Sequence, residues 1–168
     1  MEVGARAVVP TDLEVVVALC EFGSDELRDH RGGAIWSRWE GRPDPIDASI
    51  RATADDPRSQ LIVGTIDETV IGYAAVDDVT LHDDSHVGNL TDLYVLPEAR
   101  GVGVGEAMME QAISWCRARG CIGIDSIALP GDRATKNFFE SFGLVARALR
   151  VHRSLRVSDR SRPGPSSR

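Results

Sequence analysis

The stretch "PEARGVGVGEAMM", which runs from Pro97 to Met109, contains the most informative local pattern of this chain. It follows the apolar run "LYVL" and leads into a segment whose apolar residues lie mostly on one broad side of a helix. Glycine costs backbone entropy, so three alternating glycines indicate a need for bare amide groups or for a backbone conformation that a side chain forbids. We therefore predict a strand, a glycine turn and a helix in succession.

A glycine turn before a helix favours the binding of anions. The first amides of a helix have no partner within the helix and carry a partial positive charge. Glycines let a phosphate group approach these amides closely, and Arg100 adds a positive charge at the rim. The alternative is a glycine-rich turn that binds no ligand.

Two common nucleotide motifs do not fit this turn. The dinucleotide pattern G-x-G-x-x-G, started at Gly101 and Gly103, needs a third glycine where Glu106 stands. The P-loop pattern fails as well, because the chain contains no Gly-Lys-Ser/Thr. The motifs therefore argue against a protein that binds ATP or NAD.

Length and charge restrict the class of protein. The 168 residues are expected to form one domain over residues 1–157, followed by a flexible tail over 158–168. The formal net charge of −7 disfavours a nucleic-acid partner and favours a cationic small molecule or a basic peptide. No apolar run approaches the roughly 20 residues that span a membrane, and no signal-peptide pattern opens the chain. We expect a cytoplasmic location and no membrane partner.

Neither the cysteines nor the histidines form a metal-binding pattern. Cys20, Cys116 and Cys121 include no CxxC pair and are expected to be reduced, small apolar residues. The run from His82 to His86, "HDDSH", has ligand-type residues, but it has the composition of a hairpin loop rather than of a helix that would place both histidines on one face. We expect no metal.

The remaining pattern alternates strands and helices in one α/β layer structure. The expected elements are a strand at 5–9, a helix at 12–22 that ends near Gly23, a broken helical region at 24–39, a short helix at 46–56, strands at 60–67, 69–78 and 88–96, a helix at 103–119, a strand at 121–129, a short helix at 131–143 and a last strand at 144–155.

In this setting the glycine turn resembles a known signature. "RGVGVG", from Arg100 to Gly105, is similar to the R/Q-x-x-G-x-G/A motif of the GNAT superfamily, the acyl-CoA-dependent N-acetyltransferases. "FFESFGL", at 138–144, resembles the Y-E-x-x-G-F block of the same family, and the element order agrees over residues 5–155. The resemblance implies an α/β GNAT fold, a central mixed, mostly antiparallel β-sheet flanked by helices.

The same resemblance implies acetyl-CoA as co-substrate. The amides of the turn would hold its pyrophosphate, and the pantetheine arm would lie along the strand that bears Leu93 and Val95. The amide at or beside Val95 would bind the thioester carbonyl and stabilise the tetrahedral oxyanion. The residues implied for acetyl-CoA are Leu93, Tyr94, Val95, Arg100, Gly101, Val102, Gly103, Val104, Gly105, Asp132, Asn137 and Phe139.

One residue departs from the family pattern. Many members have a tyrosine where Phe139 stands, and its hydroxyl is thought to protonate the leaving thiolate. Phe139 has no hydroxyl, although a thiol with a pKa of about 8.5 can leave as the thiolate without help. We expect Phe139 to pack on the sheet. Asp132 and Asn137 are alternatives for a polar contact to CoA.

The acceptor side is less defined. The attacking amine must lose a proton, and Asp92 is the first candidate for the base, with Asp125 second; either carboxylate is otherwise simply solvated or paired. Trp36 and Trp39, spaced three apart, form either an aromatic wall of the acceptor pocket or part of the core. His86 is a candidate for proton relay at the pocket entrance, or a residue of a solvated loop.

The sequence thus predicts an enzyme that transfers an acetyl group from acetyl-CoA to a small primary amine or a peptide amine by direct attack. Two alternatives stay open: a GNAT-fold module that binds acyl-CoA without turnover, and a nucleotide-binding protein. A homodimer is compatible with the resemblance, and the acceptor is not determined.

Overall fold

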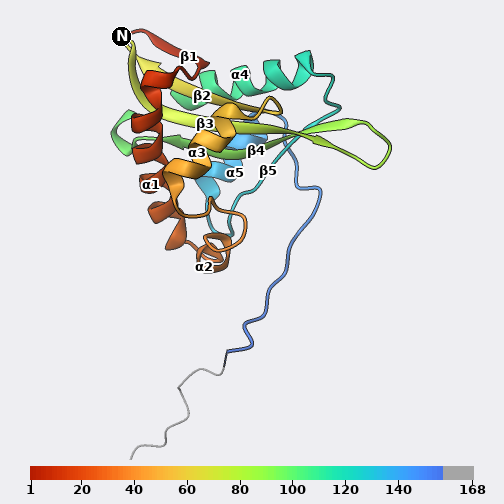
Figure 1. The fold of residues 1–168 in the computed structure, drawn as a ribbon. Helices are drawn as coiled ribbons and strands as arrows, with labels where there is room; N and C mark the ends of the chain where they lie inside the picture. Colours follow the sequence, from red (N-terminus) through yellow and green to blue (C-terminus); the bar gives the residue numbers. More distant parts are fainter. Residues whose placement is uncertain (157–168) are drawn as a thin grey trace, which may run out of the picture.

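A computed structural model of the chain describes residues 1–156, which form one five-stranded sheet with helices on both faces (Figure 1). The predicted tail at 158–168 lies outside the described residues. The strands are β1 (Val3–Ala7), β2 (Ser59–Ile66), β3 (Thr69–Thr80), β4 (His86–Val95) and β5 (Ile124–Ser126). The helices are α1 (Leu13–Arg28), α2 (Gly33–Trp36), α3 (Ile46–Asp55), α4 (Val104–Ala118) and α5 (Arg133–Ser141), with 3-10 turns η1 (Pro10–Asp12) and η2 (Pro97–Ala99).

The strands lie in the order β1-β2-β3-β4-β5. Neighbours run antiparallel from β1 to β4, and only β5 runs parallel to β4. The tight turn between β2 and β3 places Asp67 and Glu68 at positive φ, as a two-residue hairpin requires. The predicted mixed, mostly antiparallel sheet flanked by helices is confirmed.

The sheet separates two apolar cores. On one face Met108, Met109 and Ala112 of α4 pack with Phe139 of α5 against alternate residues of the strands. On the other face α1 and α3 cover a second cluster that includes Tyr73 of β3. Because side chains alternate along a strand, neighbouring residues of β4 belong to different faces.

Strand β4 bends away from β5 near its middle. Pairing with β3 shifts register between Ala75 and Val76, so Thr91 is an extra residue on β4, the pattern of a β-bulge. Pairing with β5 ends at Leu90, which lies opposite Ser126. The second half of β4 therefore has an edge that β5 does not cover, and the strand predicted over 121–129 is correspondingly shorter.

The predicted end of the first helix at Gly23 is wrong. Helix α1 continues to Arg28, and Gly23 lies buried inside it. A Cβ atom at this position would come within 3.0 Å of the Tyr94 ring. The glycine therefore allows a close approach between α1 and β4 and does not terminate the helix.

The last predicted strand, at 144–155, is also wrong. These residues are extended but form no strand in the described chain. The large apolar side chains at alternate positions of this segment, Val145, Leu149, Val151 and Leu155, are between 83% and 91% exposed. The alternation that predicted a strand is present, but no strand of the described chain pairs with the segment.

Two further structural features concern the described residues only. None of their helices combines the length and the apolar character needed to cross a membrane. Within the same part of the chain, no three His, Cys, Asp or Glu residues come together as a metal site, and His82 and His86 are not such a group.

Candidate active site

The glycine turn presents a row of backbone amides. Gly101 and Gly103 have φ values of 80° and 101°, which L side chains rarely adopt, and Gly103 caps α4. The first hydrogen bond of the helix runs from the amide of Ala107 to the carbonyl of Gly103. In the described part of the chain, the six N–H groups of residues 101–106 have no acceptor. Six free donors at a helix N-terminus are suited to an anion.

The residues that flank these amides have different environments. Val102 is 39% exposed, whereas the side chain of Val104 is buried in the core, so only its amide faces the turn. A Cβ atom on Gly105 would come within 3.4 Å of the Phe138 ring of α5. This ring therefore lies close to the start of α4.

The open edge of β4 meets the same turn. The amide of Leu96 donates to Ile71 of β3, and backbone groups alternate in direction along a strand. The N–H groups of Leu93 and Val95 therefore point to the edge that β5 leaves uncovered, and that of Tyr94 points to β3. The amides of the turn and those of the strand thus form one continuous donor surface.

Arg100 is already engaged in the described structure. Its Nη atoms donate to both carboxylate oxygens of Glu26 on α1, at 3.0 and 2.8 Å, and its Nε donates to the Val95 carbonyl at 2.9 Å. The guanidinium also lies 5.4 Å from the centre of the Tyr94 ring. Its side chain thus fixes the turn against α1 and β4.

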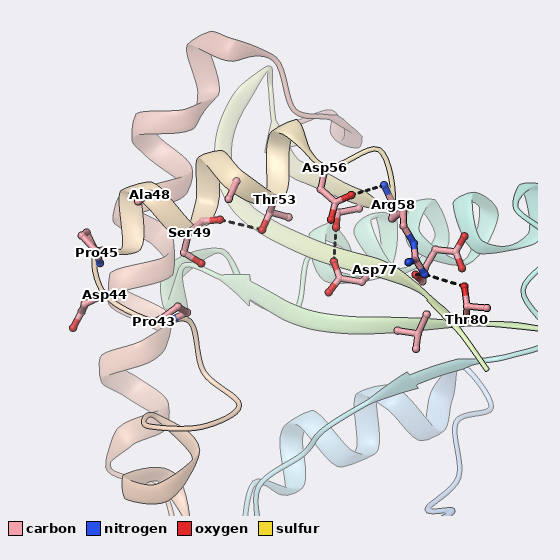
Figure 2. Close-up of a pocket in the computed structure, with 14 residues that line it drawn as sticks. Pro43, Asp44, Pro45, Ala48, Ser49, Thr53, Asp56, Arg58, Asp77 and Thr80 are labelled. Atoms are coloured by element: carbon pink, nitrogen blue, oxygen red, sulfur yellow. Dashed lines mark hydrogen bonds between the residues drawn. The ribbon is translucent and has the colours of Figure 1, made fainter. Parts of the chain in front are cut away.

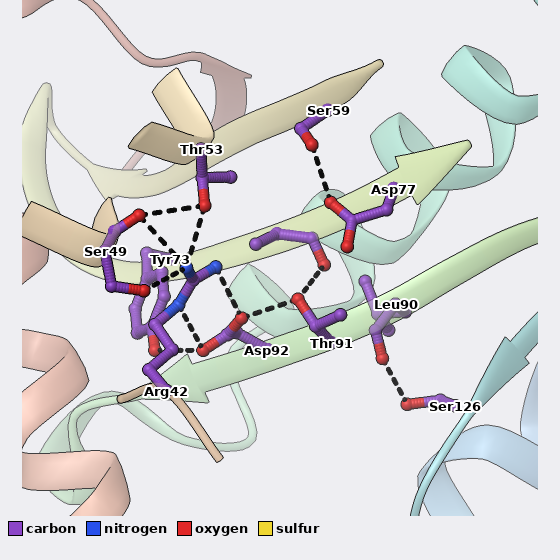
Figure 3. Close-up of polar contacts among 11 residues, drawn as sticks. Arg42, Ser49, Thr53, Ser59, Tyr73, Asp77, Leu90, Thr91, Asp92 and Ser126 are labelled. Atoms are coloured by element: carbon purple, nitrogen blue, oxygen red, sulfur yellow. Dashed lines mark hydrogen bonds and ion pairs between the residues drawn. The ribbon is translucent and has the colours of Figure 1, made fainter. Parts of the chain in front are cut away.

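Asp92 is the centre of a polar network on the α1 and α3 face (Figure 3). Arg42 donates to both carboxylate oxygens, at 3.1 and 2.8 Å, and these two side chains are 12% and 11% exposed. The hydroxyls of Tyr73 and Thr91 donate at 2.8 and 2.6 Å. Four donors fill the usual acceptor positions of a carboxylate, and Thr91 is the exposed one among the donor residues.

The pKa values in this network follow from burial and from the charge of Asp92. Burial disfavours the guanidinium charge, but the attraction of Asp92 outweighs it, so the pKa of Arg42 is raised. Burial, followed by the negative charge of Asp92, raises the pKa of Tyr73 well above its usual value. Tyr73 is therefore a neutral hydrogen-bond donor to a charged carboxylate.

A pocket of about 280 Å³ opens beside Asp92. Both predicted wall residues, Trp36 and Trp39, line it. Trp36 is the last residue of α2, but Trp39 follows in a hydrogen-bonded turn, so the two do not share one continuous helix. Glu40 and Asp77 add two further carboxylates to the lining.

A wider groove of about 760 Å³ continues from this pocket between α3 and the strands β2 and β3 (Figure 2). Asp77 lines both cavities, and Asp44 and Asp56 add negative charge along the groove. The pocket at Asp92 is the one that adjoins the open half of β4, because Thr91 and Asp92 are part of its lining.

Helix α5 places its candidate residues differently. The carboxylate of Asp132 accepts from the amide and the hydroxyl of Thr135, at 3.1 and 2.7 Å, and so caps the helix. Phe139 is 7% exposed and belongs to the core beneath α4. Its ring centre lies 5.9 Å from that of Phe138. Asn137 directly precedes these two phenylalanines in α5.

Two predicted residues lie away from the pocket. Asp125 of β5 pairs with Asn89 of β4 and is bound by Arg147. His86 begins β4, about 30 Å from Val95 at roughly 3.3 Å per strand residue. Its Nδ1 atom lies 2.6 Å from a carboxylate oxygen of the buried Asp78. These roles stay predictions, and the structure does not bring the two residues together with Asp92.

The geometry described so far is a helix N-terminus with free amides, joined to an open strand edge and an acidic pocket. A model of the acetyltransferase (GNAT) family matches residues 24–144. The chain belongs to this family. The predicted resemblance is confirmed.

Curated relatives of this GNAT chain are acetyltransferases. An aminoglycoside N(6')-acetyltransferase type 1 of Stenotrophomonas maltophilia is 31% identical over 97 residues, which are 52% of this chain and 63% of the relative. One of Klebsiella aerogenes is 35% identical over 68 residues, 39% of this chain and 45% of the relative. The chain thus matches less than two thirds of the length of these relatives.

Solved structures share the GNAT fold over nearly the whole chain. A mutant form of the BH1408 protein from Bacillus halodurans superposes with a TM-score of 0.76 at 21% identity, covering 92% of this chain and 99% of that one. The aminoglycoside acetyltransferase AAC(6')-Iy, in complex with the bisubstrate analogue CoA-S-monomethyl-acetylneamine, superposes with a TM-score of 0.72 at 20% identity. The match covers 94% of this chain and 100% of that one.

Four residues of this GNAT site do not follow from the sequence motifs. Arg42 and Tyr73 surround Asp92 from distant parts of the chain, and Glu26 holds Arg100 from α1. Glu40 enters the pocket from the turn after α2. The only local signal is that Glu40 directly follows the second tryptophan of "WSRWEGR".

Proposed function

We propose that this GNAT protein is an N-acetyltransferase that moves an acetyl group from acetyl-CoA to an amine by direct attack in a ternary complex. The observation that carries the proposal is the continuity of the free amides at 101–106 with the open edge of β4. A pyrophosphate and an extended pantetheine arm require an anion cradle and a strand edge in this order. The CoA complex of AAC(6')-Iy, of the same fold, supports this use of the surface.

In the proposed complex the chain binds acetyl-CoA chiefly with its backbone. The amides of the turn hold the pyrophosphate, and Arg100 acts by keeping the turn against Glu26 and Val95. Leu93 and Val95 present amides to the pantetheine and the thioester. Phe138, close to Gly105, would flank the cofactor, and Asp132 would act as a helix cap.

The chemistry then needs three contributions. The amide of Val95 stabilises the oxyanion of the tetrahedral intermediate. Asp92 accepts the proton of the attacking amine, either directly or through a water molecule, by exchanging the hydrogen bond of the exposed Thr91. The thiolate of CoA leaves unprotonated or takes a proton from solvent, because Phe139 is buried and has no hydroxyl.

The acceptor is proposed to be a small-molecule amine with positive charge. Two curated relatives are aminoglycoside acetyltransferases, and the pocket and groove are lined by the carboxylates of Asp44, Asp56 and Asp77. Ammonium groups bind such a surface by charge attraction. We also propose, from the sequence alone, a cytoplasmic location and a homodimer.

The experiment that tests the proposal is acetyl transfer to a panel of amines, with release of the CoA thiol as the readout. The panel contains aminoglycosides, diamines, monoamines and a peptide with a free amino terminus. We expect thiol release and an acetylated product with aminoglycosides or diamines. Tight binding of acetyl-CoA without transfer to any amine would contradict an enzymatic function.

That second outcome describes the alternative candidate, a GNAT module that binds acyl-CoA without turnover. Two observations favour it, and the first is that Phe139 replaces the expected tyrosine and lies in the core. The engaged Asp92 also lacks a free acceptor position. The panel separates the two candidates directly.

A further inference from the structure

The segment that follows α5 differs in charge from the residues that precede it. Residues 144–156, here called the basic segment, contain Arg147, Arg150, Arg153 and Arg156 and no acidic residue. In residues 1–143, by contrast, acidic residues clearly outnumber basic ones. An arginine-rich segment attached to an acidic body is attracted to it.

Arg150 of the basic segment reaches the candidate acceptor pocket. Its guanidinium forms an ion pair with Glu40 and lies 4.8 Å from the centre of the Trp39 ring. Glu40 and Trp39 both line the pocket that contains Asp92. A carboxylate and an aromatic face that hold one cation together form a recognisable cation-binding arrangement.

Little besides charge holds Arg150 in this position. Apart from Leu144, which is partly buried against the core, the large apolar side chains of the basic segment are between 83% and 91% exposed, so residues 145–156 bury almost no apolar surface. The side chain of Arg150 is itself 67% exposed, whereas that of Glu40 is 20% exposed. An ion pair with one exposed partner is weak and is easily replaced by another cation.

We propose that Glu40 and Trp39 form a cation subsite at the edge of the acceptor pocket, and that Arg150 is its internal occupant. An acceptor with a second cationic group, an ammonium or a guanidinium, binds there by displacing Arg150. The subsite selects dicationic acceptors over monocationic ones. Only a dicationic acceptor can place one amine in the pocket and at the same time use its second cation to displace Arg150 from Glu40. This inference rests on the proposed function, in which the pocket receives the amine.

The test uses matched pairs of acceptors. Each α,ω-diaminoalkane, from diaminopropane to diaminooctane, is compared with the monoamine of the same chain length. We expect Arg150→Ala to lower the KM and the Kd of the best diamine by about 3- to 10-fold, because the competitor is removed. The values for the monoamine are expected to stay unchanged.

Two further variants make the result specific. Glu40→Gln is expected to raise the KM of the same diamine by about 3- to 10-fold and to abolish the effect of Arg150→Ala in the double variant, since the two residues act on one site. Arg153→Ala is the matched control, because Arg153 belongs to the same basic segment and forms no ion pair among the described residues. Arg153→Ala is expected to leave the KM and the Kd of both the diamine and the monoamine unchanged.

The outcomes separate this inference from the proposed function. Equal effects of Arg150→Ala on diamine and monoamine would overturn the subsite and assign Arg150 a structural role. Absence of transfer to any amine would overturn the proposed function alone, because calorimetric binding of the diamine still reports on the subsite. A diamine Kd that is the same in wild type, Arg150→Ala and Glu40→Gln would overturn the subsite in either case.

Discussion

Gly103→Val is expected to lower the affinity for acetyl-CoA by at least about 100-fold. Gly103 has a φ of 101° and caps α4, so a β-branched residue forces the turn out of the conformation that aligns its amides. Loss of one or two charge-assisted hydrogen bonds, at about 1.5–3 kcal/mol each, accounts for an effect of this size. Calorimetric titration with acetyl-CoA measures it.

Gly120→Val is the matched control for this variant. Gly120 follows the other end of α4, has a φ of 76° and has no atom within 4 Å of the position of a Cβ atom. Both variants introduce similar backbone strain, of roughly 1–2 kcal/mol, so thermal unfolding shows a comparable loss of stability. Only Gly103→Val should lose affinity for acetyl-CoA. Full affinity in Gly103→Val would show that the turn does not bind the pyrophosphate.

Asp92→Asn is expected to reduce both turnover and stability. The variant leaves the buried guanidinium of Arg42 without a counter-charge, which costs about 3–5 kcal/mol of unfolding free energy. It also removes the proposed proton acceptor, for which a decrease in kcat of about 100-fold or more is expected. Urea unfolding and the rate of thiol release measure the two effects separately.

The double variant Arg42→Gln with Asp92→Asn distinguishes the two roles of Asp92. It contains no unpaired charge, so much of the lost stability is expected to return. Turnover is expected to stay low because the proton acceptor is still absent. Recovery of both stability and turnover would show that Asp92 only positions its neighbours and that the proton leaves by another route.

The cofactor half of the site was predictable because it depends on local sequence. The glycines at 101 and 103, the strand before them and the helix after them lie within one short stretch, and the structure confirms the positive φ values and the start of α4. The strands β2, β3 and β4 were predictable from their β-branched residues for the same reason. Local patterns determine local structure.

The other half was not predictable because it depends on distant contacts. Arg42, in the segment before α3, and Tyr73 of β3 meet Asp92 only in the folded chain, and nothing near Asp92 in the sequence indicates them. The prediction that the first helix ends at Gly23 is wrong because the close approach of this glycine to Tyr94 joins two elements that are distant in the sequence. The alternation at 144–155 predicted a strand, but pairing also needs a partner edge, which the pattern does not contain.

Calorimetric titration of the full chain with acetyl-CoA, ATP and NAD in parallel tests most directly whether this site binds acetyl-CoA. We expect acetyl-CoA to bind with a micromolar Kd and ATP and NAD to bind far more weakly, because only acetyl-CoA extends from the amides of 101–106 along the open edge of β4. Binding of ATP or NAD with equal or higher affinity than acetyl-CoA would contradict this expectation.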